Sequence, residues 1–249
     1  MALSPSQSFA MGAIPLPTRI SLDNFAHVIG THDAQGWLFG RQLFNSLVVS
    51  GATAVVGLGL STTAAYALSR WDFPGRDRSM GAFLLTQMFP QVVMAIPLYI
   101  LLDTMHLLDS LTGLILVYAT TSVPFSTWTL KGYFDTIPVD LEEAALLDGA
   151  SRFTTFRYVI LPLARPALAV TGLFSFMTAW NEFILAATFI GDPRGFTLPV
   201  VLQRYVSDYS TEWGHFAAGA LIVSLPVVLL FFALQRHFVE GLTAGGVKG

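Results

Sequence analysis

The amino-acid sequence predicts an all-α protein, a multi-pass bundle of transmembrane helices. Composition supports this fold class, because 53% of the 249 residues are hydrophobic and only 12% are charged. An ordinary soluble domain carries about 25% charged residues. Long uncharged runs also recur along the chain, and the mean hydropathy is +0.61. The chain therefore has too little polar surface for a soluble enzyme and too many apolar residues for a disordered protein.

Five of the uncharged runs are long enough to cross a bilayer. A spanning helix needs roughly 20 mainly apolar residues, because every backbone polar group must be bonded within the segment. Glu182 is the one charged residue inside these runs. Small residues crowd the first run, which suits close contact between helices in lipid. The expected spans are 44–69, 80–102, 110–130, 167–190 and 215–235.

Lys and Arg predict the orientation, because they are enriched in cytoplasmic loops. Nine of the 13 Lys and Arg residues fall in one set of alternating loops. We therefore expect loops 70–79 and 131–165 to face the cytoplasm. Segments 103–109 and 191–214 are then expected on the outer side.

The same topology divides the chain into an extracytoplasmic amino-terminal segment 1–43, a transmembrane domain 44–238 and a cytoplasmic tail 239–249. The outward amino terminus is unexpected, because residues 1–30 lack the continuous apolar run of a signal peptide. Either the first segment crosses unaided, or a spanning helix precedes Met1 in the native protein. We favour the second explanation.

The residue inventory argues against several kinds of site. A net charge of −3 gives no basic surface for nucleic acid, so no nucleic-acid partner is expected. The chain has no cysteine, hence no disulfide, thiolate zinc site or thiol nucleophile. It also lacks a Gly-x-x-x-x-Gly-Lys-[Ser/Thr] phosphate loop and any His/Asp/Glu cluster with metal-ligand spacing. We expect no catalytic residue, metal or cofactor in this chain, and expect its five histidines to be loop or interfacial residues.

The loop expected to face the cytoplasm has helix signals of its own. Asp140, followed three residues later by Glu143, has the form of a capping box, which predicts that a helix starts there. Gly149 is expected to end this helix. Ser151 can cap a second short helix, which should end before Pro162. The two helices would form a compact cytoplasmic knob.

The first short helix has a narrow face. Leu141, Ala144 and Ala145 fall on one side of it at helical spacing. The small alanine side chains, followed by Gly149 and Ala150, would let another protein approach closely. The alternative is a helical hairpin packed on the spans of this chain.

This segment resembles the EAA loop of permease subunits in binding-protein-dependent ABC importers. The resemblance rests on Glu143-Ala144-Ala145, on Gly149, and on Val159-Ile160-Leu161-Pro162, where the family usually has isoleucine at the position of Val159. Trp128 to Phe134 and the carboxyl tail most resemble the second permease subunit of maltose/maltodextrin importers. Further segments similar to the family, mainly its carbohydrate branch, are Asn45-Ser46, 64–70, 73–76, 87–90, 180–183 and 241–249.

The resemblance implies a function and a set of partners. Family members lie in the bacterial inner membrane and have six spans, the first of which this chain would lack. Two permease subunits form the pathway and two cytoplasmic ATPase subunits bind ATP and magnesium. An extracytoplasmic binding protein delivers the sugar. This chain would be half of an importer pathway for maltose, maltodextrin or a related oligosaccharide, surrounded by membrane lipid.

The resemblance also implies residues that transmit ATPase closure to the spans. Glu143 would pair with an ATPase arginine, and Leu141 or Leu147 would anchor the contact. The small residues would permit the close fit. The full expected coupling set is Leu141, Glu142, Glu143, Ala144, Ala145, Leu147 and Gly149.

Four residues are candidates for the translocation path. Glu182 is the one carboxylate well inside an expected span, where such a group is a functional hypothesis by default. It could contact the path or the partner permease, or form a helix-to-helix hydrogen bond with Asn181 as helper. In the second span, Pro90 and Pro97 beside Gln87 either kink the helix for packing or break it so that it lines a path. The candidate path residues are Gln87, Pro90, Asn181 and Glu182.

The loop 191–214 is the candidate contact for the binding protein. It interleaves polar and aromatic residues, which suits a sugar or protein contact, although an interfacial aromatic belt would look the same. The candidate contacts are Arg194, Tyr205, Tyr209 and Trp213.

Two other functions compete with an importer subunit. An ion-coupled carrier or channel without ATPase partners would be expected to show several intramembrane charges or an inverted repeat. The chain has one such carboxylate and no evident repeat. The other competitor is a scaffold whose spans only hold partners together. Co-purification of an ATPase through residues 139–149 would separate these functions.

Overall fold

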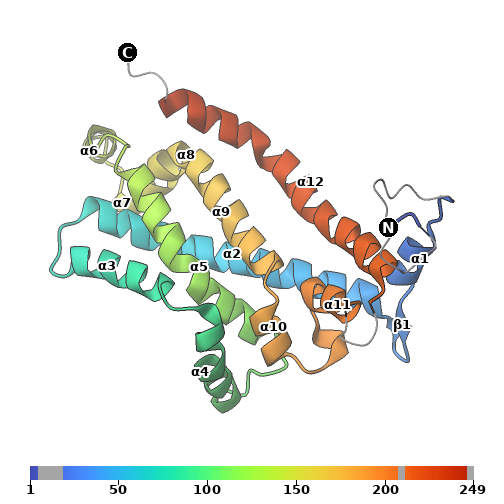
Figure 1. Cartoon of the computed structure of the whole chain (residues 1–249). Helices are drawn as coiled ribbons and strands as arrows, with labels where there is room; N and C mark the ends of the chain where they lie inside the picture. The colour runs from blue at the N-terminus through green and yellow to red at the C-terminus, as the bar shows by residue number, and fades with distance from the viewer. Residues whose placement is uncertain (5–18, 207–210, 246–249) are drawn as a thin grey trace. The chain divides into compact units, whose positions relative to one another are not determined.

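The computed structural model describes the backbone of residues 1–4, 19–206 and 211–245, with side chains up to residue 235. The described chain is almost entirely helical, so the predicted all-α class is confirmed (Figure 1). A two-residue antiparallel hairpin is the one exception among the named elements. In order they are α1 (Asp23–Ile29), β1 (His32–Asp33), β2 (Gly36–Trp37), α2 (Leu38–Arg70), α3 (Arg76–Gln87), α4 (Gln91–Thr104), α5 (Leu111–Phe134), α6 (Asp140–Leu147), α7 (Arg152–Thr155), a π-helical turn (Phe156–Ile160), α8 (Leu161–Leu163), α9 (Arg165–Trp180), α10 (Ile184–Phe189), a 3-10 turn (Pro193–Gly195), α11 (Leu198–Arg204) and α12 (Trp213–Gly245).

The chain divides into two units by its internal contacts. Unit 1 comprises Met1–Ser50, Met94–Ile115 and Trp180–Leu229. Unit 2 comprises the remaining segments, Gly51–Val93, Leu116–Ala179 and Leu230–Gly249. The divisions fall inside helices α2, α4, α5, α9 and α12.

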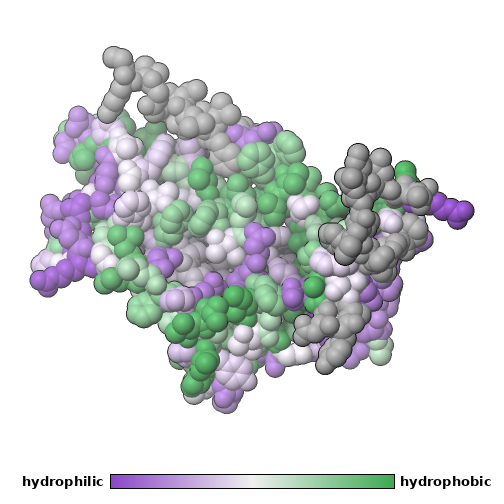
Figure 2. Space-filling view, in the orientation of Figure 1, coloured by the Kyte–Doolittle hydropathy of each residue, from purple (hydrophilic) through white to green (hydrophobic). Residues whose placement is uncertain are grey.

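The sequence predicts five spans, but fewer helices are long and apolar enough to cross a bilayer without a break. Within the described residues they are α2, with 33 residues, and Trp213–Gln235 of α12. The number rises to four if the bent pair α3/α4 and the bent pair Arg152–Leu163/Arg165–Trp180 each count as one span. The remaining expected segment, 110–130, forms α5, a continuous helix of 24 residues in which Ser and Thr dilute the apolar side chains. Hydrophobic side chains are nevertheless exposed over α4, as Figure 2 shows.

Two expected spans are interrupted: the break in 80–102 is one of the two outcomes expected from its prolines, whereas the break in 167–190 corrects the prediction of a continuous helix. The segment 80–102 breaks between Gln87 and Gln91, because Pro90 has no N–H to continue the ladder. The segment 167–190 ends its first helix at Trp180 and resumes at Ile184. At the carboxyl end α12 continues to Gly245, so it extends into the tail expected at 239–249.

Unit 1 is held together partly by polar side chains of the first turns of α2. Asn45 donates to the carbonyls of Arg194 and Phe196, at 2.7 and 3.1 Å, and is almost fully buried. The Ser46 hydroxyl accepts the N–H of Leu198 at 2.7 Å, and Gln42 donates to the Pro193 carbonyl at 2.9 Å. These hydrogen bonds satisfy backbone groups of the turn 193–198, which has few backbone–backbone hydrogen bonds of its own.

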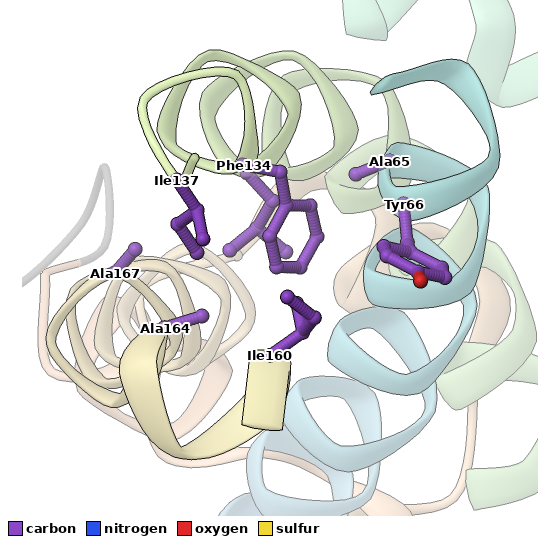
Figure 3. Close-up of a cluster of buried hydrophobic side chains, with 8 residues drawn as sticks. Ala65, Tyr66, Phe134, Ile137, Ile160, Ala164 and Ala167 are labelled. Carbon is purple, nitrogen blue, oxygen red and sulfur yellow. The ribbon is translucent and has the colours of Figure 1, made fainter. Parts of the chain in front are cut away.

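The core of unit 2 lies where α2, the end of α5 and the segment from the π-turn to α9 meet. Figure 3 shows Phe134 and Ile137 pointing toward Ile160 and Ala164, with Tyr66 beside them on α2. The buried cluster comprises Ala65, Tyr66, Leu130, Phe134, Ile137, Ile160, Ala164 and Ala167.

Small residues let α2 and α5 approach each other closely within unit 2. A Cβ at Gly57 would lie 2.6 Å from the Ser122 hydroxyl oxygen, whereas a Cβ at Gly59 would meet no atom within 4 Å. We therefore expect Gly57→Leu to lower the free energy of unfolding by about 1–3 kcal/mol through overpacking. Gly59→Leu, on the open side of the same helix, is the matched control and should not lower it, because leucine meets no neighbour there and has a helix propensity up to about 1 kcal/mol better than glycine.

Thermal unfolding of the detergent-purified protein measures both variants. Equal destabilisation by the two substitutions would contradict a close contact specific to Gly57.

Candidate functional site: the helical elbow

Helix α6 begins differently from the prediction. The capping box does not form, and no side chain caps the helix. Instead the first turn opens at Pro138, whose carbonyl accepts the N–H of Leu141, while the Val139 carbonyl accepts the N–H of Glu142 at 2.8 Å. Proline has a φ angle preset for a helical first turn and has no N–H to leave unpaired. Asp140 is therefore inside the first turn and does not cap it.

The end of α6 confirms the prediction at Gly149. This residue has a φ of +87°, a conformation that glycine adopts without a Cβ clash. Its N–H donates to the Leu146 carbonyl, and the N–H of Ala150 donates to the Ala145 carbonyl, both at 3.0 Å. This pair of bonds is a Schellman motif, which satisfies carbonyls that the helix end leaves free.

The second short helix starts as predicted and continues further than predicted. The Ser151 hydroxyl accepts the N–H of Thr154 at 3.1 Å, so its capping role is confirmed. The helix does not stop before Pro162. A π-helical turn lets the N–H of Leu161 reach back to the Phe156 carbonyl, and Pro162 then lies in the first turn of α8, where its missing N–H is tolerated. We call α6, α7, the π-turn and α8 together the elbow.

The predicted coupling residues lie on or directly after a helix in which no residue is fully buried. None of the eight residues of α6, all within the described chain, is buried. Leu147 is 88% exposed and Leu141 is 43% exposed. Glu143, Ala144 and Gly149 are also exposed, whereas Ala145 is half-buried. Figure 1 shows α6 beyond the end of α5. The open face of α6 differs from the π-turn that follows α7, where Ile160 is buried against α2 and α5, so the alternative of a hairpin packed on this chain's own spans holds for the second half of the hairpin and not for α6.

Glu142 is the exception among these residues, because its carboxylate turns toward α2. It forms an ion pair with Arg70 and accepts a hydrogen bond from the Tyr66 hydroxyl at 2.7 Å. The side chains of Arg70 and Glu142 are only 8% and 12% exposed. Arg70 also donates to the Ile137 carbonyl at 3.0 Å. Sequence reasoning missed Tyr66 and Arg70, although both lie in a segment that resembled the family.

A second polar link lies next to this ion pair. Asp135 accepts hydrogen bonds from Ser69 and Lys131, each at 2.7 Å. Partial burial raises the pKa of the Asp135 carboxyl, but the hydrogen bonds from Lys131 and Ser69 outweigh it and leave the pKa below its usual value. The link therefore persists at neutral pH and loosens only when the medium becomes acidic enough to protonate this carboxyl.

The four candidate path residues lie at or beside the two helix breaks. Gln87 ends α3 and donates to the Thr121 carbonyl at 3.1 Å, and Pro90 lies in the break before α4; both belong to unit 2. Asn181 and Glu182 lie in the break before α10 and belong to unit 1.

Glu182 is not inside a spanning helix, which corrects the expectation from sequence. Its two carboxylate oxygens accept the N–H groups of Leu185 and Ala186, at 2.9 and 3.0 Å. A carboxylate at a helix start satisfies free N–H groups and interacts favourably with the helix dipole. The geometry therefore gives Glu182 a local structural role.

Some of the candidate contacts for the binding protein already have partners within unit 1. Arg194 forms an ion pair with Asp33 at 2.9 Å, and Trp213 opens α12. Tyr205 lines a cavity of about 260 Å³ together with Arg204. Burial raises the pKa of the Tyr205 hydroxyl above its usual value. Tyr209 lies outside the described residues.

Two histidines that are far apart in the sequence also meet in unit 1. The rings of His27 and His215 stack at a centroid distance of 4.0 Å, and His215 contacts Glu212 at 2.8 Å. His27 lies in α1 and His215 in α12, so neither is a loop residue, and the alternative expectation of an interfacial position stays a prediction.

Comparisons with known proteins agree with the geometry. The family described as binding-protein-dependent transport system inner membrane component matches residues 44–243. The trehalose transport system permease protein SugB of Mycobacterium tuberculosis is 36% identical over 251 residues, covering 100% of this chain and 89% of that protein. The maltose/maltodextrin transport system permease protein MalG of Escherichia coli K12 is 39% identical over 256 residues, covering 97% of this chain and 86% of that protein.

A solved structure shows the same fold. A bacterial ABC transporter involved in import of the acidic polysaccharide alginate contains a chain with a TM-score of 0.78 and 24% sequence identity. The match covers 95% of this chain and 87% of that chain.

The turn held by α2 provides a test of unit 1. We expect Asn45→Ala to lower the free energy of unfolding by about 1–3 kcal/mol, because two buried carbonyls lose their donor. Gln35→Ala, at an exposed position, should change it by less than about 0.5 kcal/mol. Thermal unfolding measures both variants, and an Asn45→Ala protein as stable as the control would show that the turn does not depend on these bonds.

Proposed function

The chain belongs to the family of inner membrane components of binding-protein-dependent transport systems, and we propose that it is a permease subunit of an ATP-driven sugar importer. SugB and MalG, whose names specify trehalose and maltose/maltodextrin transport, match nearly its whole length. The proposed substrate class is maltose, maltodextrin or a related oligosaccharide. The chain would form half of the pathway, and the other half would be a second permease subunit.

The exposed face of α6 carries this proposal. It presents an acidic side chain, Glu143, beside the apolar Leu147, and neither is used for packing within unit 2. Leu141, Leu146 and Leu147 are all exposed on this one short helix, and exposed apolar side chains gathered among polar groups are typical of a surface that another protein covers. Ala144 and Gly149 lack the bulk to keep a partner at a distance. We propose that two cytoplasmic ATPase subunits, which bind ATP and magnesium, dock on this elbow and its counterpart in the partner permease.

The loops that each unit contains support the membrane orientation that the proposal requires. Unit 2 contains both loops assigned to the cytoplasm, 70–79 and 131–165. Unit 1 contains the described parts of the three segments assigned to the outer side, 1–43, 103–109 and 191–214. Each unit thus groups loops that the Lys and Arg distribution assigns to one face of the membrane.

Apolar surfaces on other helices suit the remaining partners. In α4, Ile96 and Ile100 are 70% and 59% exposed. The most apolar window of α12 has only 11% of its residues buried. We propose that the second permease and membrane lipid cover these helices.

The loop 191–214 is the proposed contact for an extracytoplasmic sugar-binding protein. Its first turn is fixed by Asn45 and Ser46, so it would offer a partner a preformed backbone. Arg194 and Trp213 lie in this loop or at its end, and Tyr205 lines the adjoining cavity. An ion-coupled carrier is less well supported, because its main candidate group, Glu182, is engaged in capping α10.

The proposal predicts the effect of reversing the charge of Glu143. Glu143→Lys should leave membrane insertion unchanged, because the side chain is exposed. It should reduce retention of the ATPase during purification by about tenfold or more and abolish sugar uptake, since a like charge would face the docking arginine. Asp72→Lys is the matched control, because the Asp72 side chain is 93% exposed on a neighbouring loop.

Uptake in membrane vesicles and the ATPase content of the purified complex measure the outcome. Normal retention with normal uptake in the Glu143→Lys protein would exclude the docking role of α6.

A further inference from the structure

The orientation of α6 requires an explanation, because apolar packing does not supply it. A helix normally keeps its direction by burying one face against its neighbours. The residues of α6 are all exposed or half-buried. The bonds that tie its first turn to α2 are therefore polar, and they come from Glu142.

Both oxygens of the Glu142 carboxylate are used. Oε1 pairs with Nε of Arg70, and Oε2 accepts the hydroxyl of Tyr66 at 2.7 Å. The same guanidinium also bonds the Ile137 carbonyl, just ahead of α6. Arg70 thus holds the start of the helix at two points, and the low exposure of the pair strengthens its electrostatic attraction.

The last turns of α2 also contact the other parts of the elbow and α5. The Tyr66 ring lies 4.6 Å from the Phe156 ring of the π-turn and 5.9 Å from the Phe134 ring of α5. It also meets Trp71 edge-on at 5.3 Å, and Arg152 of α7 lies over the Trp71 ring. Four pieces of unit 2 therefore converge on the end of one long helix.

We propose that Tyr66 and Arg70 are positioning residues that clamp the docking helix to α2, so that movement of α6 by a partner is passed directly to α2. This inference rests on the proposed function and adds the route by which force leaves the elbow. Without the clamp, α6 could turn about the chain segments at its two ends while its partner remained bound. Docking and ATP hydrolysis would then continue without moving α2.

The position of α6 can be measured directly, because the chain has no cysteine of its own. Spin labels are placed at Asp148→Cys, which directly follows α6 and lies outside the expected coupling set, and at Thr63→Cys of α2, both exposed positions, in the complete complex in lipid nanodiscs. Electron paramagnetic resonance then gives the distribution of distances between α6 and α2. The clamp predicts a narrow distribution that becomes at least twofold wider in Glu142→Gln and in Tyr66→Phe.

Tyr66→Phe is the decisive variant, because it keeps the aromatic packing and removes only the hydroxyl. Asp72→Asn is the matched control, since it weakens the exposed ion pair of Asp72 with Arg76 and should leave the distribution unchanged. An unchanged distribution in both Glu142→Gln and Tyr66→Phe would overturn the clamp.

The second readout is sugar imported per ATP hydrolysed in proteoliposomes, which a merely structural defect would not change. Glu142→Gln and Tyr66→Phe should retain the ATPase and keep hydrolysing ATP, but import about tenfold less sugar per ATP. A parallel fall of uptake and hydrolysis, at constant sugar per ATP, would contradict the clamp. Failure of the proposed function gives a different result from failure of the clamp. If α6 does not dock an ATPase, the Glu143→Lys protein retains its ATPase, and the distances between the labels still report whether α6 is held to α2.

Discussion

The buried ion pair between Arg70 and Glu142 is the interaction on which the arrangement of the elbow depends. A helix that leaves its surface open to a partner cannot also use that surface for folding, so its direction must be set by few and strong bonds. Burying two charges costs several kcal/mol unless both are well paired, and removal of one partner of such a pair typically costs about 3–5 kcal/mol. Here the Tyr66 hydroxyl and the Ile137 carbonyl complete the pairing. Because α6 leaves its surface open to a partner, the ion pair of Glu142 with Arg70 sets its direction in place of apolar packing.

The bilayer imposes a second constraint, which the helix breaks satisfy locally. Backbone groups freed at a break need partners within the protein, because lipid offers none. The carboxylate of Glu182 supplies acceptors at the start of α10, and Gln87 bonds the Thr121 carbonyl beside the break that contains Pro90. At the break before α10 a polar side chain thus completes the backbone bonding, and at the break before α4 a polar side chain ties the end of α3 to α5.

Sequence reasoning succeeded where the determining signal was local. Gly149 and Ser151 act within one turn of the chain, so their roles as helix end and cap could be read directly. The capping box at Asp140 failed because Pro138, only two residues earlier, started the turn first. The partner of Glu142 could not be predicted, since Arg70 is 72 residues away and the pairing depends on how α2 and α6 meet. Uncharged runs predicted long apolar segments, and the prolines of the second run indicated that it could be broken, but no proline marks the break between Trp180 and Ile184, which was therefore not foreseen.

The most direct test of the account is photo-crosslinking from α6 in intact cells. A photoreactive amino acid in place of Leu147, the most exposed apolar residue of the helix, should form an adduct with the ATPase subunit of the same transporter. The same group in place of Leu229, an exposed residue of α12, should not form that adduct. An ATPase adduct from Leu147 alone is the predicted result. An adduct of Leu147 only with lipid, with an extracytoplasmic protein or with this chain itself would contradict the account.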